Sequence, residues 1–199
     1  DLFRSCGRLV VLLPKCQDMV EVLKEHGACF MLQGINGRYV DEENAKKMRE
    51  RCMRLGLDID GALNGLTLVE HPEQMPALES GMYFDADIPV DVMQKEVGNY
   101  IKITGASFGK DRQMSGEMTK MGVNKATGMQ RLMDELKIGR EDTIAFGDGP
   151  NDVEMLQFAG TGVAMGNAIP AVKQYADMVT DKIDEDGLYH AFERLHLLG

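Results

Sequence analysis

The sequence predicts an α/β protein in two parts, a small α/β domain over residues 1–116 and part of a parallel-sheet domain over residues 117–199. Three observations predict this class. Short apolar runs of strand length alternate with amphipathic segments of helix length. After Gly116 the alternation becomes a regular βαβαβα with short connections, which is typical of a parallel sheet covered by helices. The loop Gly147–Asp152 follows one apolar run, at the strand end where such sheets carry their chemistry.

The first part predicts short strands and helices separated by turn-forming residues. Strands are expected at Leu9–Leu13, Ala28–Leu32, Gly81–Phe84 and Tyr100–Thr104. Helices are expected from Pro14 to His26, from Asp41 as N-cap to Leu55 before Gly56, and at Val90–Val97. The stretch from Asp58 to Gly81 is rich in turn formers, and its pattern does not decide between helix, strand and loop.

The second part begins with a helix that has apolar residues at 3-and-4 spacing. The expected helices are Lys125–Leu136, Asn151–Ala159, Ala168–Tyr175 and Gly187–Leu197. The expected strands are Thr143–Phe146, Gly162–Met165 and Met178–Thr180.

The composition is that of a globular protein, with 44% hydrophobic and 27% charged residues among 199. The net charge of −10, from 32 acidic and 22 basic residues, argues against nucleic acid or an anionic membrane as partner, since both need a basic surface. No apolar run approaches the roughly 18–20 residues of a membrane span, and no signal peptide is visible. A small anionic substrate stays compatible, because a lysine and a metal ion can hold it locally.

The four cysteines (Cys6, Cys16, Cys29 and Cys52) lie at irregular spacing without a CxxC pair. This indicates reduced thiols in a cytoplasmic protein, with a disulfide or metal set as the alternative. The 15 methionines are scattered and are interpreted as core residues. The chain begins at Asp1 and not at Met, which suits an excised or processed fragment.

The loop Gly147–Asp152 (GDGPND) places two carboxylates and an amide between a buried strand and a helix N-terminus. Oxygen ligands of this kind suit a hard cation such as Mg²⁺, and the helix N-terminus suits an anion held by that cation. The alternative is that Asp148 and Asp152 merely cap the following helix. Taken alone, the loop favours neither interpretation.

Lys125 gives this loop a context. It stands near the start of a helix, where the helix dipole disfavours a cation. A lone lysine there is usually only solvated. A lysine followed, one helix and one strand later, by the GDxxND pattern is a more specific pairing.

With these motifs, residues 117–199 resemble the C-terminal core of Cof-type phosphatases, subfamily IIB of the haloacid dehalogenase superfamily. The matching stretches are Gly122–Gly128, Thr143–Asp152, Leu156–Ala168, Ala176–Thr180 and Glu185–Leu188. Residues 1–116 resemble the α/β cap of that subfamily more loosely, through VLLPK, FMLQGINGRYV and YIKITG. The resemblance implies the C-terminal half of a Rossmann-like parallel-sheet core plus a small cap of the C2B type.

The resemblance also implies roles for single residues. Lys125 would hold the phosphoryl group and neutralise its developing charge. Asp148 would bind Mg²⁺, Asn151 would contact the phosphate, and Asp152 would steady the metal or bind it through water. Two further residues in matching stretches, Asn167 and Asp186, are interpreted as structural.

In this family an apolar strand ending in DxDGT supplies the nucleophilic Asp, and both it and the next motif precede the cap. These motifs are therefore expected upstream of residue 1. The segment Asp58–Leu63 (DIDGAL) looks similar, but a charged helix precedes it and Ala62 stands where the family has Thr. It is expected to be a loop. The 199 residues alone are therefore expected to lack phosphatase activity.

The intact protein is expected to hydrolyse a small phosphorylated metabolite, such as a sugar phosphate, through an aspartyl-phosphate, with the cap choosing the substrate. One alternative is a regulatory protein that binds phosphate and has lost its nucleophile; another is a phosphomutase on the same scaffold. Because only part of the core sheet is present, self-association through the incomplete core is also expected.

Overall fold

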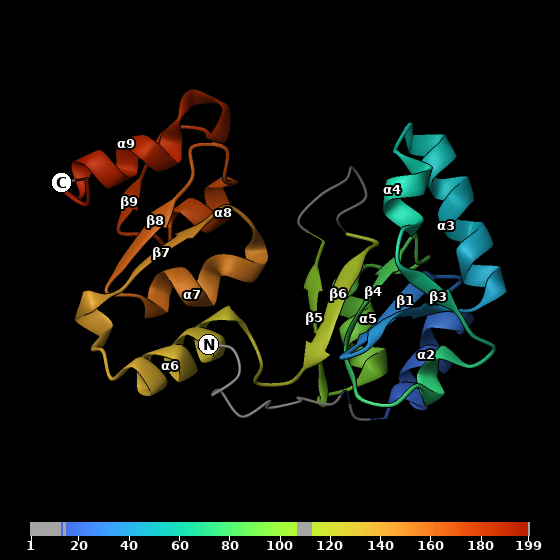
Figure 1. Cartoon of the computed structure of the whole chain (residues 1–199). Coiled ribbons are helices and arrows are strands. Elements are labelled where there is room, and N and C mark those ends of the chain that lie inside the picture. Colours follow the sequence, from blue (N-terminus) through green and yellow to red (C-terminus); the bar gives the residue numbers. More distant parts are fainter. Residues whose placement is uncertain (1–12, 14, 107–112, 199) are drawn as a thin grey trace. The chain divides into compact units, whose positions relative to one another are not determined.

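The computed structural model describes residues 13, 15–106 and 113–198. The chain forms two compact units, Asp1–Gly122 and Val123–Gly199 (Figure 1). Both contain helices and strands, and the second contains a parallel sheet, which confirms the α/β class. The division falls six residues later than expected, because strand β6 (Gly116–Lys120) pairs with strands of the first unit. The expected strand Leu9–Leu13 lies, except for Leu13, outside the described residues.

The first unit contains a six-stranded sheet in the order β3-β2-β1-β4-β6-β5. Besides β6, its strands are β1 (Cys29–Gly34), β2 (Gly37–Val40), β3 (Leu66–Leu68), β4 (Leu78–Phe84) and β5 (Ile101–Gly105). The strands pair antiparallel, except that β2 and β3 run parallel. Since β6 lies between β4 and β5, it joins the edge strand β5 to the rest of this sheet.

Helices cover both faces of this sheet. They are α2 (Cys16–Glu25), α3 (Glu42–Leu55), α4 (Ile59–Leu63), α5 (Val90–Val97) and a 3₁₀ turn, η1 (Pro72–Gln74). Buried side chains of α2 and α5, among them Leu23 and Met93, pack with Phe30 and Tyr83 of the sheet. On the other face Met48 of α3 packs in a separate cluster. The unit therefore has two hydrophobic layers about one sheet.

Two expectations about α3 and its surroundings have different outcomes. The cap at Asp41 is confirmed, since its side chain accepts a hydrogen bond from the Asn44 amide at 2.7 Å. The helix also ends at Leu55 before Gly56, which has a positive φ of 66°. The loop expected at Asp58–Leu63 is wrong: residues 59–63 form helix α4, with the exposed Asp58 at its N-cap position. The element directly before Asp58 is helix α3 and not a strand.

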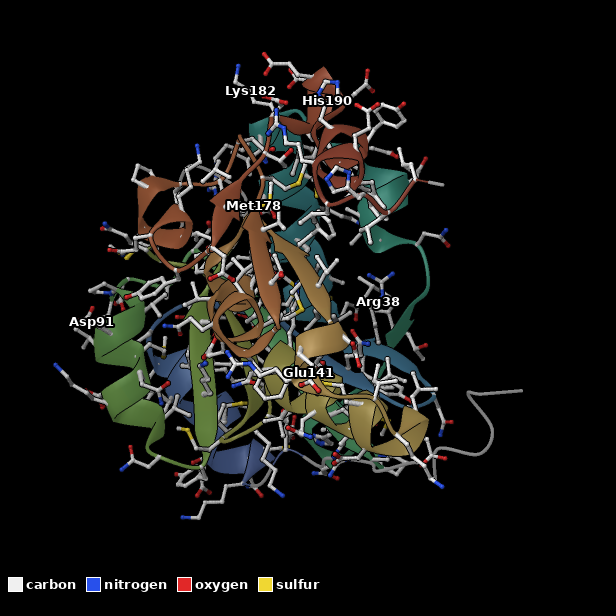
Figure 2. All side chains as sticks on the ribbon, turned by 90° about the vertical axis from the view of Figure 1, so that its left-hand side faces the viewer. Arg38, Asp91, Glu141, Met178, Lys182 and His190 are labelled. Atoms are coloured by element: carbon white, nitrogen blue, oxygen red, sulfur yellow. The ribbon has the colours of Figure 1, made fainter. Side chains whose placement is uncertain are left out.

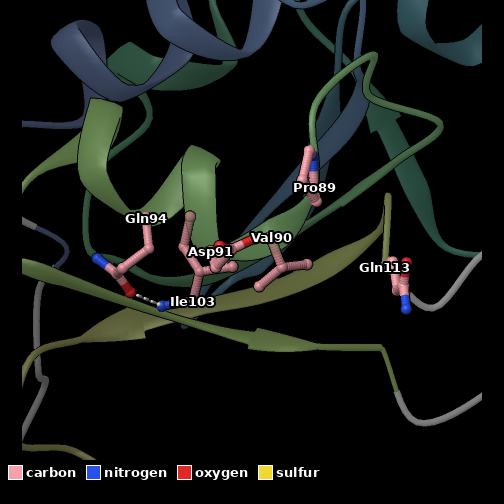
Figure 3. Close-up of a pocket in the computed structure, with 6 residues that line it drawn as sticks. All are labelled: Pro89, Val90, Asp91, Gln94, Ile103 and Gln113. Carbon is pink, nitrogen blue, oxygen red and sulfur yellow. Dashed lines mark hydrogen bonds between the residues drawn. The ribbon is translucent and has the colours of Figure 1, made fainter.

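Gln94 ties α5 to the edge strand β5. Its side-chain nitrogen donates to the carbonyl oxygens of Gly98 and Ile101, at 2.9 and 2.8 Å, and its oxygen accepts from the Ile103 amide at 2.7 Å (Figure 3). These bonds occupy polar backbone groups that an edge strand otherwise exposes. A pocket of about 620 Å³ lies beside Gln94.

The second unit contains a three-stranded parallel sheet in the order β7-β8-β9. The strands are β7 (Ile144–Gly147), β8 (Thr161–Ala164) and β9 (Met178–Val179). The helices are α6 (Lys125–Leu136), α7 (Val153–Phe158), α8 (Pro170–Lys173) and α9 (Gly187–Arg194), with 3₁₀ turns η2 (Arg140–Asp142), η3 (Pro150–Asp152) and η4 (Ile183–Glu185). This order confirms the expected βαβαβα pattern, although the helix expected from Asn151 begins as a 3₁₀ turn.

Small side chains form the core of the second unit. Ala145 of β7, Ala164 of β8 and Leu156 of α7 are buried in one cluster. On the α9 side, Phe146 stacks on Phe192 with ring centroids 5.5 Å apart. The apolar face of α6 is covered only in part, since Leu132 remains 47% exposed. The packing holds the carboxyl ends of β7 and β8 in register.

Two further observations concern surface and thiols. No helix in the described part of the chain is long and apolar enough to span a membrane. Cys16, Cys29 and Cys52 are free thiols, the last two buried, while Cys6 lies outside the described residues. Burial is the main cause that raises the pKa of Cys29 to about 12, so this thiol stays protonated at neutral pH.

Candidate active site

A pocket of about 370 Å³ lies at the carboxyl ends of β7 and β8 in the second unit. Figure 2 shows this end of the sheet, with Lys182 and His190 beyond Met178 of β9 and Glu141 toward the opposite end. Its lining combines polar and charged side chains with apolar ones. The lining residues are Lys125, Phe146, Gly147, Asp148, Asp152, Met165, Asn167, Ile183 and Leu188. The structure thus brings together three of the residues singled out from the sequence, namely Lys125, Asp148 and Asp152.

Lys125 is positioned by the start of α6. Asn124 caps this helix, since its side chain accepts from the Thr127 amide at 2.9 Å while the Thr127 hydroxyl accepts from the Asn124 amide at 3.0 Å. This reciprocal capping fixes the first helical turn. The half-exposed ammonium group of Lys125 donates to Oδ1 of Asp152. Lys125 therefore faces the pocket and stays accessible to an anion.

Asp152 is the buried anchor of the loop, with 4% of its surface exposed. Its Oδ2 accepts from the amides of Asp148 and Gly149, at 3.0 and 3.1 Å. Burial acts to raise the pKa of Asp152, but the hydrogen bonds from Lys125 and from these two amides outweigh it, so the pKa lies below its usual value. Since chain donors engage both oxygens, Asp152 stabilises the loop and does not present a free carboxylate.

Gly147 allows this arrangement. A Cβ atom at Gly147 would lie 2.5 Å from Cβ of Asp152, which is closer than two carbon atoms can approach. The glycine at the end of β7 is therefore required by the position of the buried carboxylate.

Asp148 is the exposed carboxylate of the pocket. Its Oδ2 accepts a hydrogen bond from Nδ2 of Asn167 at 3.1 Å. Oδ1 of Asn167 accepts in turn from the Ile183 amide at 3.2 Å. Asn167 was interpreted as structural from the sequence, yet it lines the pocket. One signal was available: Asn167 follows β8 as Asp148 follows β7, and the carboxyl ends of parallel strands meet at one edge.

Two other candidate residues do not line this pocket. Asn151 lies half-buried in η3, outside the lining set. Asp186 has a positive φ of 54° before α9, and its carbonyl oxygen accepts from the His190 amide at 3.0 Å. Asp186 therefore contributes its backbone to the start of α9.

The alternative that both aspartates merely cap the following helix fits Asp152 but not Asp148. Asp152 does bind amides of its own turn, as a capping residue does. Asp148, in contrast, makes its hydrogen bond to a loop from another strand. The carboxylate that capping leaves unexplained is the one exposed in the pocket.

The donor set fits a hard divalent cation in part. Asp148 offers carboxylate oxygen to the pocket, which suits Mg²⁺. Two carboxylates and one ammonium group leave the pocket with a net charge of −1, which disfavours a phosphate; a bound divalent cation would reverse that sign. No group of three or more His, Cys, Asp or Glu that could hold a metal occurs among the residues the structure describes. These residues would thus supply some of the ligands of such an ion.

Comparisons with known proteins identify the family and the fold of this chain. A family model described as haloacid dehalogenase-like hydrolase matches residues 13–192. The chain is 56% identical over 72 residues to the 5-amino-6-(5-phospho-D-ribitylamino)uracil phosphatase YitU of Bacillus subtilis, a match that covers 36% of this chain and 27% of YitU. It is 35% identical over 128 residues to YcsE, which has the same name and source, and here the match covers 61% and 49%. The chain thus spans between a quarter and a half of the length of these relatives.

Solved structures extend the comparison to nearly the whole chain. The subclass IIB sugar phosphatase BT4131 matches with a TM-score of 0.73 and 25% identity, covering 94% of this chain and 68% of that one. Both units therefore have counterparts in the fold of that protein.

Proposed function

We propose that this chain, which belongs to the haloacid dehalogenase-like hydrolase family, holds the metal ion and the transferring phosphoryl group in a phosphatase for small phosphate monoesters. Membership of the family confirms the resemblance to Cof-type, subfamily IIB members inferred from the sequence. One observation carries the proposal. Lys125, one helix and one strand earlier in the chain, meets Asp148 and Asp152 at the carboxyl end of a parallel sheet in one pocket.

Lys125 is proposed to bind the phosphoryl group and to stabilise the charge that develops on it. Its half-exposed side chain leaves the ammonium group within reach of an anion, and the contact with Asp152 holds it at the pocket wall. Asp152 keeps the loop in shape. Asn151, although outside the lining set, stays a proposed phosphate contact, since it lies in the turn η3 directly before α7.

The metal is proposed to be Mg²⁺, with Asp148 as its ligand and Asp152 as support. When bound, Mg²⁺ would supply positive charge against the phosphoryl oxygens. Asp152 supports the ion through the loop and not by direct contact, because its oxygens already accept hydrogen bonds from Lys125, Asp148 and Gly149.

The substrate is proposed to be a phosphorylated metabolite such as a sugar phosphate. Support comes from a sugar phosphatase that shares the fold, and from relatives named for a phosphorylated ribityl compound. The first unit is proposed to choose among such substrates as the cap of the enzyme.

The attacking carboxylate is proposed to lie outside these 199 residues, which would then be inactive alone. Of the described residues that line the pocket, two are carboxylates, and both are already assigned to metal binding or loop support. Asp58, the other candidate, follows a helix in the first unit and does not end a strand.

The test is hydrolysis by the complete gene product, measured as free phosphate released from a panel of phosphorylated metabolites with Mg²⁺. Asp148→Asn and Lys125→Ala should each lower kcat by about 100-fold or more. Asp142→Asn and Arg131→Ala, which change an exposed carboxylate and an exposed cation of the same unit, should leave it unchanged. Equal activity of Asp148→Asn and the wild-type protein would refute the proposed metal site.

The same assay separates the two alternatives. A phosphate-binding regulatory protein would release no phosphate from any substrate, and a phosphomutase would return it to an organic product. The 199-residue chain should release none. Hydrolysis by this chain that falls in Asp58→Asn would contradict the assignment of the nucleophile.

A further inference from the structure

We infer that Asn167 is a positioning residue that orients the Asp148 carboxylate and links it to the loop that carries Ile183. This inference rests on the proposed function, because it concerns how the same site is held ready for a cation. It assigns a role to a residue that pattern matching alone treats as structural.

The side-chain amide of Asn167 uses both of its ends. Nδ2 donates to Oδ2 of Asp148 at 3.1 Å, and Oδ1 accepts from the Ile183 amide at 3.2 Å. The three residues follow three different strands of the sheet, β7, β8 and β9. A single side chain therefore joins all three loops at the carboxyl edge.

The backbone that carries Asn167 is held on both sides. The Gly166 amide donates to the Asp181 carbonyl oxygen at 3.0 Å, and the Ala168 amide donates to Met165 at 2.9 Å. A Cβ atom at Gly166 would lie 2.6 Å from backbone atoms of Asp181 and Lys182, so the two loops approach as closely as glycine allows. Because these contacts hold the backbone on both sides of Asn167, its side-chain amide starts from a fixed position although the residue is exposed.

An amide suits this position chemically. Its N–H group donates to one oxygen of Asp148 and adds no charge, so the carboxylate keeps its full charge for a cation. A ligand held by a neighbour in this way loses less freedom when the cation binds, and removal of such partners weakens metal binding about 10–100-fold.

The same amide places Ile183, which is 66% exposed although it lines the pocket. The hydrogen bond from its backbone holds the loop at this position, and its side chain lines the pocket. Asn167 thus couples Asp148, which would hold the cation, to the loop of Ile183, an apolar lining residue that an organic group could meet.

The test compares the 199-residue chain with Asn167→Ala and with the control Gln174→Ala. Gln174 is also an exposed amide of the second unit, and it donates to the carbonyl oxygen of Ala171 at 3.1 Å. Two quantities are measured. One is the chemical shift of the Asp148 carboxyl carbon in metal-free protein at pH 7, and the other is the Mn²⁺ dissociation constant from electron paramagnetic resonance.

Asn167→Ala should move the Asp148 resonance and weaken Mn²⁺ binding about 10-fold or more, with an unchanged far-UV circular dichroism spectrum. Gln174→Ala should change neither quantity. An Asp148 resonance that stays in place in Asn167→Ala overturns the inference, as does an unchanged Mn²⁺ dissociation constant. If the wild-type chain binds no Mn²⁺, the proposed metal site fails in this chain, and the Asp148 resonance alone decides the role of Asn167.

Discussion

Among single residues, Asp152 connects the start of α6 to the loop after β7. Its carboxylate is buried and accepts hydrogen bonds from Lys125 and from the amides of Asp148 and Gly149. The ionised carboxylate binds these donors more strongly than the protonated form, because hydrogen bonds to charged groups are stronger. The pKa of Asp152 is lowered for this reason, against the opposing effect of burial.

The lowered pKa gives a stability change at acid pH with a definite sign. A carboxylate whose pKa is lower in the folded state stabilises the fold above its unfolded pKa of about 3.9, and this contribution is lost as the pH falls through the folded pKa. We expect the free energy of unfolding of the second unit to fall from about pH 5 downward. Urea titrations followed by circular dichroism at several pH values measure this.

Asp152→Asn should reduce this fall, because it removes the titrating group. It should also cost about 1–3 kcal/mol at pH 7, since one amide oxygen replaces a carboxylate that binds three donors. Asp142→Asn, at an exposed position, is the matched control. Parallel pH curves for Asp152→Asn and the wild type would contradict this account.

At the scale of elements, substitution by alanine at two glycines of the second unit should change its stability in opposite directions. Gly147 ends β7 where a Cβ atom would meet Cβ of Asp152 at 2.5 Å, so Gly147→Ala should destabilise by about 1–3 kcal/mol. Gly128 lies inside α6, where a Cβ atom would meet nothing within 4 Å. Gly128→Ala should therefore stabilise by about 0.5–1 kcal/mol.

Urea unfolding of the two variants beside the wild type measures both effects. Each variant is a control for the other, because the same chemical change is made at a strand end and in a helix. If both substitutions stabilised the unit, Gly147 would not be required by close approach.

The sequence predicted the elements that local pattern defines. Helix α6 has apolar residues at helical spacing, and β7 and β8 are apolar runs bounded by glycine, so both types were recognised. Strand β6 was missed, because its sequence GEMTK has one large apolar residue. That residue, Met118, is fully buried, and Gly116 lets Tyr83 pack closely. Such a strand is set by neighbours distant in the chain, which no local pattern records.

The candidate site was predictable to the same degree. Lys125, Asp148 and Asp152 were found because they stand in recognisable motifs at strand and helix ends. The different roles of Asp148 and Asp152 were not predictable, because they depend on which carboxylate accepts hydrogen bonds from the backbone amides. The role of Asn167 depends on contacts between the loops that follow three strands, and the sequence alone does not show these contacts.

On the scale of the whole molecule, the sheet of the second unit has an edge at β7. Within the described residues β7 pairs with β8 alone, and apolar side chains such as Leu136 on α6 and Leu188 on α9 are more than 40% exposed. Edges and apolar surface of this kind favour association. That the 199-residue chain self-associates through this incomplete core stays a prediction.

Size-exclusion chromatography with light scattering tests it over a range of concentrations. We expect a mass above that of one chain that rises with concentration. A charge on the apolar surface, Leu188→Lys, should lower the mass, while Leu68→Lys, an equally large change at an exposed position of the first unit, should not. A single monomeric mass at every concentration would contradict the prediction.

The central claim is that the second unit holds a phosphate through a cation at Asp148 and through Lys125. Calorimetric titration of the 199-residue chain with inorganic phosphate, with and without Mg²⁺, tests it most directly. We expect phosphate to bind only with Mg²⁺, because the pocket residues alone carry a net negative charge. Binding should be lost in Asp148→Asn and in Lys125→Ala and kept in Asp142→Asn. Phosphate binding that is equal without Mg²⁺, or that survives Asp148→Asn, would contradict the claim.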